Sequence, residues 1–213
     1  ETLTQRFPNV LFESCASGGG RFDPGMLYYM PQAWASDNTD PIERLTIQFG
    51  TTMCYPASSM GAHVSACDRT GIETKAAVAM AGTFGYELDP KEMSAEDKEK
   101  VKKQVEDYHK YYNVIHFGDL YRIIAPTDDE FKCAWEHVAK DKSEALLTVV
   151  IKNRAPHDFL LIKMKGLDPE KMYRDATDGE IYSGALLMNA GINLTEGTLS
   201  AGRSFVRYFT EVK

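Results

Sequence analysis

The spacing of apolar and polar positions divides the chain into two parts with different secondary structure. In residues 1–117, short apolar runs alternate with longer segments whose apolar positions recur every three or four residues. Short buried strands that alternate with amphipathic helices are typical of parallel βα units. We count four such units, with strands that end near Ser14, Trp34, Ser65 and Tyr86. This part is therefore predicted to be α/β.

Two of the predicted helices begin with capping signals. Asp40 precedes Pro41 and lies three residues before Glu43, which gives an N-cap, a proline at the first helical position and a carboxylate at the third. Ser94 and Asp97 have the same spacing ahead of a long, highly charged helix. Asp40 therefore has a complete structural explanation as a helix cap.

Residues 118–213 follow a different pattern, in which short β runs are separated by polar turns. The runs are DLYRII, KCAWEHVA, EALLTVVIK, HDFLLIKMKG, MYRDA and SFVRYFTEV, and the turns are DKS, NRAP, GLDPE and DGE. No helix is evident among them. The pattern predicts an antiparallel β-sandwich domain, and we place the boundary between the two domains at residues 117 and 118.

The number of βα units indicates that the first domain is incomplete. A closed (β/α)8 barrel needs eight units, and an open sheet of four strands would expose an apolar edge. The first residues, ETLTQRFPNVLFESC, have the pattern of a last helical turn that runs into a buried strand, and they contain no signal peptide. We therefore expect Glu1 to be a cut end and residues 1–117 to be the C-terminal half of a (β/α)8 barrel.

Composition excludes several classes of function. The chain has 213 residues and a net charge of -7, which argues against nucleic-acid binding because phosphate recognition needs clustered cations. No run approaches the roughly 18 apolar residues of a membrane span. The four cysteines form no CxxC pair, so we expect reduced thiols, no metal site and a cytoplasmic location.

Polar residues that follow the first two strands are the candidates for chemistry, because active sites of (β/α)8 barrels lie at the carboxyl ends of the strands. Asp37 lies at such an end, three residues after Trp34. An aromatic neighbour excludes water from a carboxyl group, which suits a general acid. The alternative, equally supported by spacing, is that Asp37 hydrogen-bonds amides of its own loop.

The preceding loop, SGGGR, is rich in glycine. It lacks the remaining residues of a phosphate-binding loop, and the alternative is a loop whose backbone a ligand approaches closely. Cys15, at the head of this loop, is interpreted either as a weak hydrogen-bond donor or, with more support, as a buried thiol. We expect Arg21 and Asp23 to pair or cap locally, and His63 to be a structural residue with satisfied ring nitrogens.

The stretch ESCASGGGRFDPGMLYYMPQAWASDNTDPIERLTIQFGTTMCYP resembles the α-galactosidases of glycoside hydrolase family 36, and the bacterial tetrameric group is the most similar. Further matches occur in SSMGAHVSA, VAMAGTFGYELD and YYNVIHFGDLYRI. The resemblance implies a retaining hydrolysis of terminal α-galactosides without metal or organic cofactor. It implies that Asp37 is the general acid/base, that Cys15 and Gly18 belong to the galactose subsite, and that Trp34 forms a wall near the cleavage point.

Two departures from the family pattern limit these expectations. The family's nucleophile lies in a KWDMN-like motif, which these 213 residues lack. A retaining mechanism needs two carboxylates about 5 Å apart, so we expect the chain to need an N-terminal part of the same enzyme, and only Asp23 or Asp40 would offer a substitute nucleophile. The segment from Cys67 to Lys75 is also shorter than in the family, and Lys75 stands where an arginine is expected.

Three hypotheses therefore remain. The chain is part of a melibiose- or raffinose-type α-galactosidase that forms a homotetramer at full length. It is a folded but inactive fragment that self-associates through its open edge or complements the N-terminal part. It is part of an α-N-acetylgalactosaminidase on the same scaffold.

Overall fold

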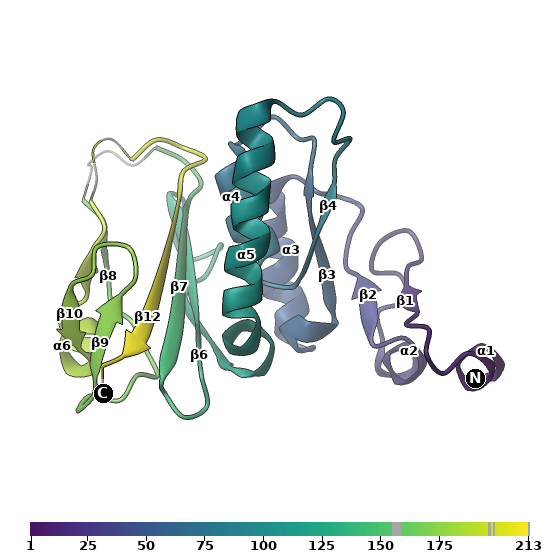
Figure 1. The fold of residues 1–213 in the computed structure, drawn as a ribbon, viewed down its shortest axis with the longest axis horizontal. Coiled ribbons are helices and arrows are strands. Elements are labelled where there is room, and N and C mark those ends of the chain that lie inside the picture. The colour runs from purple at the N-terminus through teal and green to yellow at the C-terminus, as the bar shows by residue number, and fades with distance from the viewer. Residues whose placement is uncertain (155–158, 196, 198, 213) are drawn as a thin grey trace.

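The computed structural model describes residues 1–154, 159–195, 197 and 199–212, and it consists of a parallel α/β part followed by an antiparallel β part (Figure 1). The helices are α1 (Thr2–Arg6), α2 (Pro24–Tyr29), α3 (Pro41–Thr52), the 3-10 helix η1 (Ala57–Ser59), α4 (Ile72–Ala79), α5 (Ala95–Phe117) and α6 (Gly184–Asn189). The strands of the first part are β1 (Glu13–Ser14), β2 (Gln32–Trp34), β3 (Met60–Ser65) and β4 (Thr83–Glu87). Those of the second are β5 (Asp119–Ile124), β6 (Lys132–Val138), β7 (Glu144–Ile151), β8 (Leu161–Ile162), β9 (Met172–Asp175), β10 (Ile181–Ser183), β11 (Ile192–Asn193) and β12 (Ser204–Glu211).

The first part contains the four βα units that the sequence predicts. Strands β1 to β4 lie in sequence order, and all neighbouring pairs are parallel. Asp40 accepts hydrogen bonds from the first turn of α3, and Ser94 accepts one from the backbone N–H of Asp97 at the start of α5. Both predicted caps are therefore confirmed. The carboxyl ends of the four strands meet at one edge of the sheet, which is where chemistry is expected.

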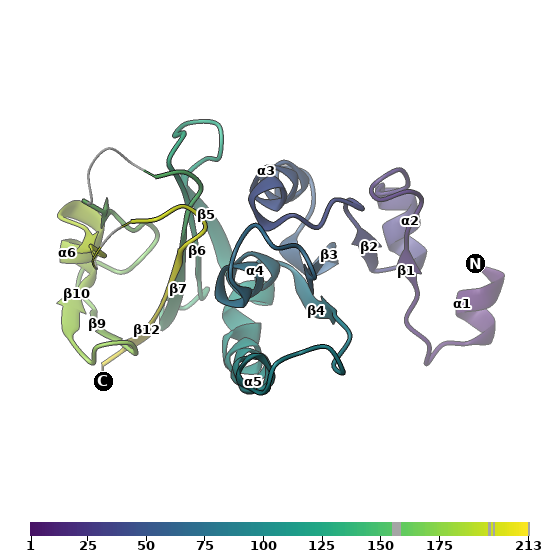
Figure 2. The ribbon, with the colours of Figure 1, turned by 90° about the horizontal axis from the view of Figure 1, so that it is seen from above.

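Helices α3, α4 and α5 lie between the parallel sheet and the antiparallel sheet (Figure 2). An apolar core fills this region, and Val64 of β3, Leu146 of β7 and Tyr208 of β12 belong to it together with residues of α4 and α5. Each of these side chains exposes 5 % or less of its surface. The α/β part and the β part therefore share buried apolar surface.

The second part is an antiparallel sheet of six strands in the order β10-β9-β12-β7-β6-β5, with a small β11-β8 pair. The central strand β7 is buried at every position after Glu144, because helices cover one face and the β8–β11 region covers the other. Its continuous apolar sequence, EALLTVVI, is typical of a strand covered on both faces. The predicted α/β-plus-β organisation is confirmed.

Several predicted details differ from the structure. The predicted strand Asn9–Ser14 is reduced to two residues in β1, and residues 24–29 form a helix whose N-cap is Asp23. The second part contains α6, which the sequence analysis did not predict, and of the run HDFLLIKMKG only Leu161–Ile162 is a strand. Residues 157 and 158 of that run lie outside the described residues. Short elements are set by tertiary contacts more than by local pattern.

Large apolar side chains are exposed at the N-terminal end of the molecule. Leu11 exposes 88 % of its surface, Tyr28 82 % and Phe7 45 %. Among the described residues, no strand pairs with the outer edge of β1 or of β4. These two features match the expected exposure of an open four-stranded sheet.

Candidate active site

The loops that follow β1 and β2 are packed backbone against backbone. Gly18 has a φ of +73°, and a Cβ atom there would lie 2.8 Å from Ser36 Cα and 2.9 Å from the backbone N of Asp37. A Cβ on Gly19 would lie 2.6 Å from the carbonyl oxygen of Ala35. The glycine run therefore lets the first loop touch the loop that carries Asp37, a contact that any side chain would prevent.

Asp37 is exposed, and its neighbours make the hydrogen bonds that shape the loop. Ser36 Oγ accepts from the backbone N–H of Asn38 at 3.1 Å, and Asn38 Oδ1 accepts from the backbone N–H of Asp40 at 3.0 Å. Asp37 itself makes no side-chain hydrogen bond or ion pair within the described part of the chain. The interpretation of Asp37 as a residue that bonds its own loop amides is therefore wrong.

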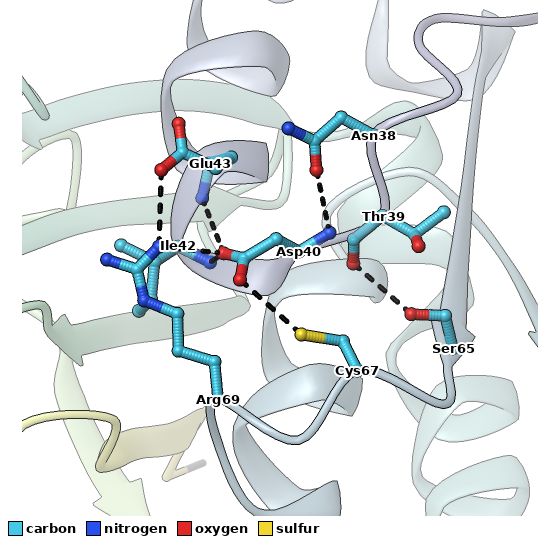
Figure 3. Close-up of polar contacts among 8 residues, drawn as sticks. All are labelled: Asn38, Thr39, Asp40, Ile42, Glu43, Ser65, Cys67 and Arg69. Carbon is cyan, nitrogen blue, oxygen red and sulfur yellow. Dashed lines mark hydrogen bonds and ion pairs between the residues drawn. The ribbon is translucent and has the colours of Figure 1, made fainter.

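Asp40, by contrast, is fully occupied by structural contacts (Figure 3). Its Oδ1 accepts from the backbone N–H groups of Ile42 at 2.9 Å and Glu43 at 3.0 Å, and its Oδ2 accepts from Cys67 Sγ at 3.4 Å. Arg69 Nη1 lies 3.3 Å from Oδ1. Burial raises the pKa of Asp40, but these bonds and the charge of Arg69 outweigh it, so the pKa lies below its ordinary value.

Loss of this cap is expected to lower the free energy of unfolding by about 1–2 kcal/mol near neutral pH in Asp40→Ala. The folded-state pKa of Asp40 lies below its ordinary value of 3.8, so the contribution is present above 3.8 and is lost as the pH falls through the folded-state pKa. Urea denaturation at about pH 7 and about pH 3 measures the difference in free energy of unfolding between wild type and variant. This gap should narrow at the lower pH. Asp40→Asn keeps a capping oxygen and should lose less. An equal gap at both pH values would contradict the assignment.

The segment after β3 is attached to the same helix start. Ser65 Oγ donates to the carbonyl oxygen of Thr39 at 3.3 Å (Figure 3), and Arg69 also pairs with Glu43 at 3.2 Å. The next helix, α4, is joined to the β part, because Thr74 Oγ1 donates to the carbonyl oxygen of Gly202 at 2.8 Å. Cys67 and Arg69, both in the segment Cys67–Lys75, therefore contact the start of the helix that follows the Asp37 loop. Lys75 lies on α4 and makes no ion pair with any described residue.

Trp34 and His63 lie on neighbouring strands and contact each other. Their ring centroids are 4.7 Å apart, and His63 Nδ1 lies 3.0 Å from Glu87 Oε1 on the next strand. A Cβ on Gly85 would lie 2.8 Å from the His63 ring, so glycine leaves room for it. These contacts support the structural interpretation of His63. Trp34 exposes 8 % of its surface in this chain, and its predicted role as a wall of the site stays a prediction.

Cys15 differs from its favoured interpretation. The residue is exposed, so the prediction of a buried thiol is wrong. It lies in the loop that begins after β1, three residues before Gly18 and on the same side of the sheet as Asp37. The structure thus brings Gly18 into contact with Asp37 and places Cys15 in the same loop. The assignment of Cys15 and Gly18 to a sugar subsite stays a prediction.

Arg44 is the residue of this region that the sequence analysis missed. Arg44 exposes 2 % of its surface, and its Nη2 donates to the carbonyl oxygen of Ser36 at 2.8 Å. The guanidinium carbon lies 4.4 Å from the centroid of the Trp34 ring. A sequence signal existed, because Arg44 shares the buried face of α3 with Leu45 and Gln48. A charged residue on the apolar face of a helix is uncommon and calls for a partner.

The described residues contain no cluster of three or more histidine, cysteine or acidic side chains that could hold a metal ion. Within the same residues, no helix is long and apolar enough to cross a membrane. In the loop after β2, Asp37 is the carboxylate without a side-chain partner among the described residues, whereas Asp40 caps α3.

Two families match the chain. Residues 1–118 match Melibiase, and residues 132–209 match the glycosyl hydrolase family 36 C-terminal domain. The bifunctional alpha-galactosidase/sucrose kinase AgaSK of Mediterraneibacter gnavus is 44% identical over 100% of this chain and 23% of its own length. Alpha-galactosidase AgaA of Geobacillus stearothermophilus is 45% identical over 91% of this chain and 27% of its own length. The chain thus spans about a quarter of these relatives.

Solved structures agree with these matches. The galactosidase domain of AgaSK superposes with a TM-score of 0.94 at 43% identity, over 99% of this chain and 30% of that one. A variant of AgaA from Geobacillus stearothermophilus in complex with raffinose also gives 0.94, at 41% identity over 99% of this chain and 30% of that one. The chain belongs to the glycoside hydrolase family 36 α-galactosidases, the melibiases.

Proposed function

We propose that residues 1–213 supply the general acid/base and the C-terminal β domain of a retaining α-galactosidase. The observation that carries this proposal is the state of Asp37, whose carboxylate is exposed at the carboxyl edge of the parallel sheet without a structural partner among the described residues. Relatives crystallised with raffinose and with stachyose support α-galactosides of this type as substrates.

The proposed reaction proceeds in two steps. Asp37 donates its proton to the glycosidic oxygen while the bond from that oxygen to the galactosyl anomeric carbon breaks and a nucleophilic carboxylate bonds to the same carbon. Asp37, now ionised, then removes a proton from water, whose oxygen displaces the enzyme carboxylate and releases galactose. Each step needs a second carboxylate about 5 Å from Asp37 on the other face of the sugar.

The described carboxylates near Asp37 are poor candidates for that nucleophile. Asp23 accepts from the backbone N–H of Met26 at 2.9 Å as the N-cap of α2, and Asp40 caps α3. Glu87 lies against His63. We therefore propose that the nucleophile comes from an N-terminal part of the same enzyme, which completes the barrel along the free edges of β1 and β4. The two parts together are called the complemented enzyme below.

The proposal predicts that p-nitrophenyl α-galactoside is hydrolysed by the complemented enzyme and not by residues 1–213 alone. Residues 1–213 are expressed alone and together with the N-terminal part of the same enzyme or of AgaA, and released nitrophenol is measured. Parallel assays with p-nitrophenyl α-N-acetylgalactosaminide test the α-N-acetylgalactosaminidase hypothesis. Faster hydrolysis of that substrate would favour this specificity over the proposed α-galactosidase specificity. Full activity from residues 1–213 alone would overturn the proposal that these residues supply the acid/base and the N-terminal part supplies the nucleophile.

A further inference from the structure

We propose that Arg44 is a positioning residue for Asp37, an inference that rests on the acid/base role proposed above. Arg44 lies in the first turn of α3, yet its side chain exposes only 2 % of its surface. A buried guanidinium is costly unless its donors find acceptors. Its acceptors here are two backbone oxygens, one in the loop after β2 and one near the start of β3.

The donors of Arg44 connect the loop after β2 to strand β3. Nη2 donates to the carbonyl oxygen of Ser36 at 2.8 Å, in the loop after β2, and Nη1 donates to that of Gly61 on β3 at 3.4 Å. Only the planar fork of arginine presents two donors in fixed geometry to two such acceptors. The Trp34 ring lies against the guanidinium, with its centroid 4.4 Å from Cζ, and limits the positions that the fork can take.

The Ser36 carbonyl belongs to the peptide bond that leads into Asp37. Because a peptide unit is planar, fixing its oxygen also fixes its nitrogen and the direction of the next Cα atom. Gly18 packs on the same peptide, within 2.9 Å of the Asp37 nitrogen if a Cβ is added. The Ser36–Asp37 peptide is therefore held by Arg44 and by Gly18, while the Asp37 carboxylate itself stays without a bond among the described residues.

The positive charge of Arg44 also attracts the Asp37 carboxylate. Burial lowers the pKa of Arg44, and the carboxylates of Glu87 and Asp37 oppose this by attraction. The side chain stays protonated, as guanidinium does in proteins. Arg44 Nε has no hydrogen-bond partner among the described residues. A fixed cation that attracts this carboxylate favours one orientation of it, which acid catalysis needs.

The test is a double-mutant cycle in the complemented enzyme with two substrates. Melibiose has a poor leaving group that needs a proton, and 2,4-dinitrophenyl α-galactoside has a good one that does not. Arg44→Gln is expected to lower kcat/KM for melibiose about 100-fold and for the dinitrophenyl substrate less than about 10-fold. In an Asp37→Asn background, Arg44→Gln should lower kcat/KM for melibiose by less than about 3-fold, because Arg44 acts by positioning Asp37.

Control variants separate positioning from folding. Gln48→Leu removes a side chain of the same helix that is also buried and donates to the carbonyl oxygen of Val78 at 2.9 Å, away from the Asp37 loop. It should lower thermal stability without favouring one substrate over the other. Arg44→Lys keeps the charge without the planar fork, so its kcat/KM for melibiose should lie between those of wild type and Arg44→Gln. If Arg44→Gln does not fold, Arg44→Lys takes its place in the test.

The positioning role would be overturned if Arg44→Gln lowered kcat/KM equally for the two substrates. It would also be overturned if Arg44→Gln lowered kcat/KM as much in the Asp37→Asn background as in wild type. The same cycle reports on the proposed function separately. If Asp37→Asn itself fails to distinguish the substrates, the acid/base assignment fails. If Asp37→Asn distinguishes them and Arg44→Gln does not, only the inference about Arg44 fails.

Discussion

Asp37→Asn is expected to lower kcat/KM of the complemented enzyme for melibiose by about 10²–10⁴-fold. Asparagine is close in shape to aspartate but carries no transferable proton, so the alkoxide leaving group would depart without protonation. Dinitrophenolate is stable as an anion, and its galactoside should lose far less in kcat/KM. Steady-state kinetics on both substrates measure the difference, which reports on proton donation rather than on sugar binding.

A matched control for this prediction is Asp23→Asn. Asp23 is an exposed aspartate of the loop after β1, and it accepts a hydrogen bond from Met26 as the N-cap of α2. Its amide variant keeps a capping oxygen, so kcat/KM should change by less than about 2-fold on either substrate. Equal losses on the good and the poor leaving group in Asp37→Asn would remove Asp37 from the acid/base role.

Gly18→Ala is expected to lower kcat/KM for melibiose by at least about 100-fold, because the new methyl group has no room. Its Cβ would lie 2.8 Å from Ser36 Cα and 2.9 Å from Asp37 N, which are backbone atoms that cannot rotate away. The loop that carries Asp37 must therefore move. Kinetics of the complemented enzyme and thermal unfolding together measure the result.

Gly179 provides the control for backbone conformation. Its φ is +79°, close to the +73° of Gly18, but nothing lies within 4 Å of an added Cβ. Alanine in this conformation costs about 1–2 kcal/mol at either position. Gly179→Ala should therefore lower stability only by this conformational cost, while activity stays intact. Retained activity in Gly18→Ala would mean that contact between the two loops does not position Asp37.

The sequence predicts those parts of the fold that depend on local chemistry. The α3 and α5 starts were predictable because the capping residues Asp40 and Ser94 act on amides within three positions of themselves. Strand β7 was predictable because burial on both faces leaves a continuous apolar run. Helix α6 was missed because it is six residues long and packs by Leu187 into the β-domain core, which no local pattern indicates.

For the candidate site, the sequence named residues but could not give their contacts. Spacing left Asp37 undecided between chemistry and loop structure, because both roles suit an aspartate after a strand. In the structure, the side chains of Ser36 and Asn38 make the loop hydrogen bonds, and Asp37 does not. The contacts of Gly18 with the Asp37 peptide and of Arg44 with Gly61 on β3 join different βα units, so they depend on the parallel pairing of strands. Sequence spacing carries no such information.

The anomeric configuration of the product that azide forms tests the central claim most directly. In Asp37→Ala of the complemented enzyme, azide needs no general base, so it should restore turnover of 2,4-dinitrophenyl α-galactoside by attacking the glycosyl-enzyme from the face that Asp37 serves. The account predicts α-galactosyl azide, with the configuration of the substrate retained, as identified by proton NMR. The β-anomer would mean that Asp37 is the nucleophile, and it would contradict the account.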